Sequence, residues 1–60
     1  MIQEYLAKIE EIRVREFLSH IEIARRIGIS YSTWVRINEY PEKCSLSTAR
    51  KLKHYVESWR

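Results

Sequence analysis

The sequence predicts an all-α protein, a compact bundle of four short helices that forms one domain over residues 1–60. Apolar residues recur every three or four positions along most of the chain, which is the spacing of one buried helix face. The single Gly and the single Pro stand where such segments end. Hydrophobic residues make up 45% of the chain, which is enough for one core, although a domain this small buries only about 60% of its unfolded surface.

The first helix is expected over about residues 2–16, where strong helix formers fill the gaps between apolar positions. Its buried stripe is expected to consist of Ile2, Leu6, Ile9 and Ile12 or Arg13. Val14, Phe17 and Leu18 lie off this stripe, so we expect them to close the turn into the second helix.

Two short helices and a tight turn are expected over residues 19–39. Ser19 can cap the first of them while Glu22 reaches back, which is the reciprocal S-x-x-E arrangement. Gly28 suits the left-handed backbone that ends a helix, and Ser30 can cap the next one. The residues expected to face the core are Ile23, Ala24, Ile27, Trp34 and Ile37. A strand in this segment is the alternative, since several of its residues favour strands, but no second strand is present to pair with it.

The third helix is expected to end near Glu39, because Pro41 disfavours helical geometry at the residue before it. A short loop then leads to Ser45, which can cap a fourth helix. The buried side of that helix is expected to consist of Leu46, Ala49, Leu52 and Val56, with Trp59 at the next step.

Charge and cysteine content restrict the classes of function. The formal net charge is +3; acidic residues outnumber basic ones in residues 1–18, and the reverse holds from residue 19 onward. Such a balance allows a nucleic-acid partner without demanding one. Cys44 has no partner for a disulfide, so a reducing compartment, the cytoplasm, is expected, and no stretch resembles a signal peptide or a membrane span.

Catalytic chemistry has little to build on in this sequence. His20 and His54 are isolated, and no second Cys or His lies at a metal-ligand spacing. No acidic pair suggests an acid–base site. We therefore expect no enzyme activity, no cofactor, no metal and no small-molecule ligand.

The run from Ala24 to Thr33, ARRIGISYST, resembles the lambda-repressor-like, or Cro/C1-type (XRE-like), helix-turn-helix family. The resemblance covers about residues 9–56. It is carried by Ile9, Ile12, Arg13, Leu18, Ser19, Ile23, Ala24, Ile27, Gly28, Ile29, Ser30, Ser32, Thr33, Arg36, Ile37, Ser45, Leu46 and Leu52. It implies a transcriptional regulator, a repressor in the simplest case, that binds double-stranded DNA as a homodimer with residues 31–39 in the major groove.

The resemblance also implies roles for particular residues. The positions that match base-reading ones are Tyr31, Ser32, Thr33 and Arg36, and those that match DNA-backbone contacts are His20, Lys43 and Ser45. The chain departs from the family pattern at three places. His20 stands where Gln is common, Trp34 replaces a small aliphatic core residue, and residues 38–40 replace the usual Glu-Asn-Gly.

The chemistry of these side chains bears on the same expectation. Arg36 lies two residues after Trp34 and should point outward, where Arg can bind guanine O6 and N7 with about 1–3 kcal/mol of discrimination; a solvated surface arginine is the alternative. Lys43 and Arg50 supply positive charge near the fourth helix, so Arg50 is a further backbone candidate. Arg25 and Arg26 end the second helix, where cations suit its dipole.

Apolar residues near the two ends exceed what so small a core needs. The candidates for a dimer surface on this ground are Tyr5, Leu6, Tyr55 and Trp59. Hydrophobic Tyr31 and Val35 on the expected DNA side leave a second function open, a protein-interaction module or adaptor that keeps the fold without specific DNA binding.

Overall fold

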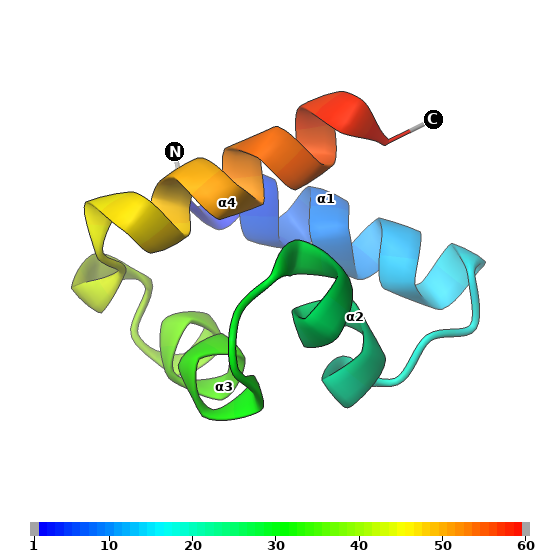
Figure 1. Cartoon of the computed structure of the whole chain (residues 1–60), viewed down its shortest axis with the longest axis horizontal. Helices are drawn as coiled ribbons and strands as arrows, with labels where there is room; N and C mark the ends of the chain where they lie inside the picture. Colours follow the sequence, from blue (N-terminus) through cyan, green and yellow to red (C-terminus); the bar gives the residue numbers. More distant parts are fainter. Residues whose placement is uncertain (1, 60) are drawn as a thin grey trace.

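The computed structural model describes residues 2–59 and has four α-helices with one short 3₁₀ turn. The elements are α1 (Ile2–Arg15), α2 (His20–Ile27), α3 (Tyr31–Glu39), η1 (Pro41–Lys43) and α4 (Leu46–Ser58). Figure 1 shows α1 and α4 side by side in one layer, with α2 and α3 packed beneath them. The predicted all-α bundle of four helices is confirmed, and every helix lies within a residue or two of its expected position. None of the described helices is long and apolar enough to span a membrane.

Three of the helices begin at a serine that serves as the N-cap. The hydroxyl oxygens of Ser19, Ser30 and Ser45 each accept a hydrogen bond from the backbone amide three residues later. Each cap satisfies one of the amides that a helix start leaves without an intrahelical partner. The predicted caps are thus confirmed, although among the described residues Glu22 makes no return bond to Ser19.

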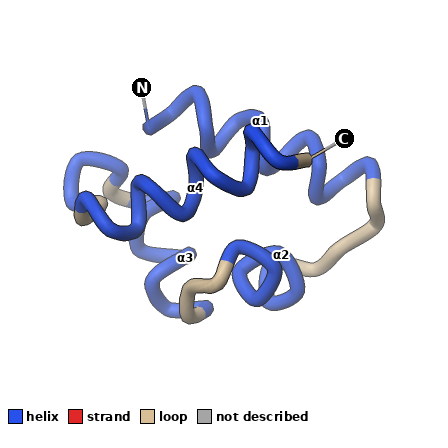
Figure 2. Tube along the Cα trace, turned by 45° about the horizontal axis from the view of Figure 1, so that its top comes forward, coloured by secondary structure: helices blue, strands red, loops and turns tan. Residues whose placement is uncertain are grey.

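The core runs between the two layers and contains one large aromatic ring. Its buried hydrophobic residues are Leu6, Ile9, Ile12, Ile23, Ala24, Ile27, Trp34, Ile37 and Leu52. Trp34, at 1% exposure, is the largest of these side chains. Ile2, Tyr5, Leu18, Tyr55 and Val56 pack against this cluster and are half-buried. Tube and ribbon views agree that α2 and α3 lie beneath the α1–α4 pair (Figure 2).

Some apolar residues expected in the interior lie on the surface instead. Val14 is 57% exposed, Phe17 95% and Leu46 69%, so the expectation that they close a turn or line the core is wrong. Val14 lies two residues after buried Ile12, which places it on the opposite side of α1, and Leu46 is the first residue of α4. The buried residues of α4 are Thr48 and Leu52, and the hydroxyl of Thr48 is bonded to Ser45.

The residues predicted to form a dimer surface are packed wholly or in part within the monomer. Leu6 is a core residue at 8% exposure, and Tyr5 and Tyr55 pack against the core. Trp59 is half-buried, with the Arg15 guanidinium 5.7 Å from its ring centroid. Tyr5 and Tyr55 thus extend the core while part of each ring stays in solvent, and the dimer surface remains a prediction.

The carboxyl ends of α1 and α2 share one pattern of hydrogen bonds. At the end of α1, the amide of Leu18 donates to the carbonyl of Arg13 and the amide of Phe17 to that of Val14. At the end of α2, Ile29 donates to Ala24 and Gly28 to Arg25 in the same way. Both ends are Schellman motifs, which place one residue in the left-handed region. That residue is Gly28 (φ 95°) in α2 and Phe17 (φ 56°) in α1.

Candidate nucleic-acid interface

The turn between α2 and α3 is held from both sides. Gly28 adopts a φ of 95°, and the amide of Ile29 donates to the carbonyl of Ala24 at 3.0 Å. From α4, the Nζ of Lys51 donates to the carbonyl of Gly28 at 3.2 Å. The turn is therefore bonded to two helices, which fixes the point at which α3 begins.

Trp34 anchors α3 to the start of α2. Its indole Nε1 donates to Nδ1 of His20 at 3.2 Å, and the two ring centroids lie 6.4 Å apart. One turn later, the amide nitrogen of Asn38 donates to the carbonyl of Trp34 at 2.8 Å. With Ile37 buried on the same side, one face of α3 is committed to the core. Because Nδ1 of His20 is the acceptor, Nε2 is the ring nitrogen that can donate outward.

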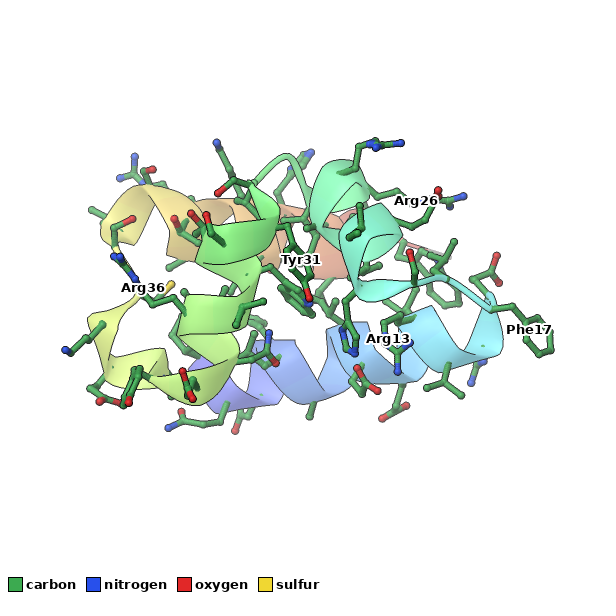
Figure 3. All side chains as sticks on the ribbon, turned by 90° about the horizontal axis from the view of Figure 1, so that it is seen from below. Arg13, Phe17, Arg26, Tyr31 and Arg36 are labelled. Carbon is green, nitrogen blue, oxygen red and sulfur yellow. The ribbon has the colours of Figure 1, made fainter. Side chains whose placement is uncertain are left out.

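The opposite face of α3 is open to solvent. Tyr31 is 49% and Val35 43% exposed, and Ser32 and Arg36 are also exposed. Figure 3 looks onto this side of the molecule and shows Tyr31 on the side of α3 next to α2, with Arg36 projecting on the other side. Neither Tyr31 nor Arg36 makes a side-chain hydrogen bond to another described residue. Both side chains are thus available to a ligand of the α3 surface.

Two of the predicted contact residues are occupied by capping bonds. The hydroxyl of Thr33 accepts from Ser30 Oγ at 2.8 Å and its amide donates to the same oxygen, while its side chain is half-buried. Ser45 Oγ donates to Thr48 Oγ1 at 3.0 Å and accepts from the amide of Thr48. These residues hold the starts of α3 and α4, and the hydroxyl of exposed Ser32 also lies 3.4 Å from Ser30 Oγ.

A shallow hollow on each side of α3 shows which predicted residues come together. A hollow of about 470 Å³ is lined by Ser32, Val35, Arg36, Glu39, Tyr40 and Lys43. A second, of about 290 Å³, is lined by His20, Tyr31, Trp34, Val35, Asn38 and Glu39. The structure thus joins Arg36 with Lys43 and Tyr31 with His20. Arg50 lies elsewhere, in a groove between α2 and α4.

Two residues of this surface were not among the predicted contacts. Glu39 lines both hollows, and Tyr40 is 46% exposed with Lys43 Nζ 5.3 Å from its ring centroid. Glu39 lies three residues and Tyr40 four residues after Arg36, which is the spacing of neighbours on one helix face. That spacing was the sequence signal that could have found them.

The electrostatics of this surface are mixed. Arg36 and Lys43 supply positive charge and Glu39 supplies negative charge, and none of the three forms an ion pair with a described residue. Cys44 lies behind them in the loop, half-buried, and burial raises the pKa of its thiol. Within residues 2–59 no group of three or more His, Cys, Asp or Glu side chains could hold a metal ion. The surface can offer hydrogen-bond donors and aromatic faces.

Comparisons of the chain with models of protein families, with curated protein sequences and with solved structures found no match.

Proposed function

We propose that this protein binds double-stranded DNA with α3 in the major groove and regulates transcription from the bound site. The observation that carries the proposal is the division of α3 into two faces. Trp34 and Ile37 hold the helix to the core, while Tyr31, Ser32 and Arg36 project from the first two turns on the other side. A short helix presented in this way has the shape and width that the major groove admits.

Each exposed residue has a role in this proposal. Arg36 reads guanine with two hydrogen bonds, and Ser32 and Tyr31 contact base edges or sugars beside it. Lys43, and His20 through Nε2, bind phosphates and set the position of the helix on the duplex. A single domain of this size buries only about 600–1,000 Å² on DNA, so specific binding needs a second copy on a second half-site.

Salt dependence of DNA binding tests the proposal. Binding of a fluorescent duplex by the full chain should weaken steeply between about 50 and 200 mM salt, because phosphate contacts release counterions. Selection from a random duplex pool should return a consensus with two half-sites. A binding constant that does not change with salt, or a pool that is not enriched, would contradict DNA binding.

The change Arg36→Ala tests the reading role within that experiment. We expect loss of about 10-fold or more in preference for the selected site, with general DNA binding retained. Arg25→Ala removes the same charge from α2 and is the matched control, which should keep the preference. If the two variants discriminate equally well, Arg36 does not read bases.

A protein-interaction module is the second candidate, and a specific observation favours it. Val35 and Tyr31 are half exposed beside the hollow that reaches Trp34, and Glu39 lies on the same surface, where it opposes a phosphate backbone. A partner helix with apolar residues would fit this hollow. Binding that persists at high salt and fails with duplex DNA would favour this function over the first.

A further inference from the structure

Two features of the surface remain unused by the α3 interface, one at the end of α1 and one between α2 and α4. The first is the α1 tip, formed by Val14, Glu16 and Phe17. The second is the α2–α4 groove, lined by Arg26, Ile27, Arg50, Lys51, His54, Tyr55 and Ser58. Together they have the properties of two halves of one contact.

The α1 tip presents an aromatic ring in full contact with solvent. Phe17 is 95% exposed, and Figure 3 shows its side chain at the outer edge of the molecule, pointing away from all four helices. Its φ of 56° lies in the left-handed region, which is a rare conformation for a bulky residue. A single exposed apolar residue is ordinary, but here exposure and backbone strain fall on the same residue. Such strain is concentrated at sites that contact ligands or partners.

The α1 tip carries one carboxylate, that of Glu16. Of the two arginines nearby, Arg13 is paired with Glu10 at 2.6 Å and Arg15 lies over the ring of Trp59. Glu16, next to Phe17, is exposed and has no ion-pair partner among the described residues. The tip is therefore a hydrophobic ring beside a free carboxylate.

The α2–α4 groove has the complementary character. It is an open groove of about 410 Å³, and apolar Ile27 and half-buried Tyr55 form part of its lining. The cations Arg26, Arg50 and Lys51 line it as well, together with His54, and no acidic residue is among its lining residues. A phenyl ring fits such a volume, and the cations at the rim would attract a carboxylate beside it.

We propose that copies of this chain associate head to tail, with Phe17 of one copy inserted in the α2–α4 groove of the next and Glu16 paired with the groove cations. Both halves lie on each chain and do not overlap, so the interface is heterologous and can repeat along a row of copies. The α1 tip and the groove lie outside the exposed face of α3, so the contact is compatible with DNA binding without depending on it. Because no two-fold axis relates copies joined in this way, a DNA site that they share is expected to contain direct repeats, whereas the site of a two-fold dimer contains inverted repeats.

Self-association without DNA tests the proposal, measured by sedimentation velocity up to about 1 mM protein. The wild-type chain should form species larger than a dimer, and the association should weaken as salt rises. Phe17→Gly should reduce the association constant about 10- to 100-fold, the range expected for an aromatic ring that is no longer buried. Because glycine prefers the backbone found at this position, this variant should fold at least as well as wild type.

Arg50→Glu tests the groove half of the contact. An acidic residue is tolerated near the start of a helix, so the variant should fold, and self-association should fall about 10-fold or more. Lys53→Glu makes the same charge change on α4 outside the groove and should associate nearly as the wild type does. Leu46→Ser removes an exposed apolar residue away from both features and should also have little effect.

Mixing the two defective variants decides the geometry of the contact. The Phe17→Gly chain keeps its groove and the Arg50→Glu chain keeps its tip, so the mixture should form a one-to-one complex with an affinity close to that of wild type. A symmetric contact through either feature would not be restored. The proposal is overturned if the wild-type chain stays monomeric, if Phe17→Gly associates normally, or if two folded variants fail to combine. It is also overturned if Arg50→Glu weakens DNA binding and leaves self-association unchanged.

Discussion

The ends of α1 and α2 are closed by the same hydrogen bonds but by residues of opposite character. Gly28 takes the left-handed position in α2 and Phe17 takes it in α1. A cationic side chain braces each turn, with Lys51 bonded to the carbonyl of Gly28 and Arg13 to that of Leu18. The comparison shows that the carbonyls of the last turn, which have no intrahelical partner, set the geometry of a helix end. The residue in the left-handed position sets the conformational free energy of that end.

The surroundings do not account for the choice of residue at these two positions. A Cβ placed on Gly28 would meet no atom within 4 Å, so a larger side chain has room there. The preference for glycine rests on the backbone alone, where a left-handed conformation costs other residues about 1–2 kcal/mol. At Phe17 the chain bears that cost with the ring in solvent, which is why we assign the ring a role at the surface.

The largest expected effect on this comparison comes from Gly28→Ala. Alanine should lower the free energy of unfolding by about 1–2 kcal/mol, since no contact is lost and only the backbone is strained. Urea denaturation measures the change, and for a domain of this size each kcal/mol lowers Tm by about 4–8 °C. Gly28→Asn is the control, because asparagine tolerates this region and should lose less. Equal stability of the alanine variant would show that the turn relaxes.

Phe17→Gly should change stability in the opposite direction and by less. Relief of the left-handed strain is offset by the entropy that glycine loses on folding, about 0.5–1 kcal/mol, so we expect a net gain of about 0.5–1 kcal/mol. Phe17→Ala removes the ring but keeps the strain, and should leave the free energy of unfolding almost unchanged. A loss of stability in the glycine variant would mean that the ring makes contacts in the monomer.

The smallest effect concerns the brace of the α1 turn. The hydrogen bonds from Arg13 hold the pKa of Glu10 below its ordinary value of 4.5. A lowered pKa means that the pair stabilises the fold above pH 4.5 and that this stability is lost as the pH falls further. The pair is exposed, so Glu10→Gln should cost only a few tenths of a kcal/mol at neutral pH.

Unfolding measured from pH 7 to pH 3 checks that assignment. The Glu10→Gln variant should lose less stability on acidification than wild type does. Glu11→Gln, a neighbouring carboxylate in no ion pair with a described residue, should follow the wild-type curve. Identical curves for wild type and Glu10→Gln would place the acid sensitivity elsewhere.

Local signals in the sequence predicted most of the fold. The caps at Ser19, Ser30 and Ser45, the break at Gly28 and the stop before Pro41 each depend on residues within one turn, so the chain itself reveals them. The burial of Trp34 and Ile37 followed from their spacing on α3. The exposure of Leu46 was harder to predict, because it is the first residue of α4 and its burial depends on tertiary packing that spacing within the helix does not specify.

The candidate site was predicted in outline. Spacing placed Arg36, and the family resemblance placed Tyr31 and Ser32, on the outer face of α3, where the structure has them exposed. It could not separate Arg50, which lies in the α2–α4 groove, from Lys43, because that difference arises from the packing of α4 on α2. The left-handed conformation of Phe17 could not be predicted either, since a sequence motif indicates such a position only when glycine or asparagine occupies it.

The separation of α3 into a buried face and an exposed face has a consequence for the evolution of this protein. Its two core side chains hold the helix, and the outer ones at positions 31, 35 and 36 make no side-chain hydrogen bond within the described chain. Substitutions at these three positions can therefore accumulate with little penalty to folding. The same scaffold can acquire new ligands by changing a few codons, and a library randomised there should yield folded proteins with altered preferences.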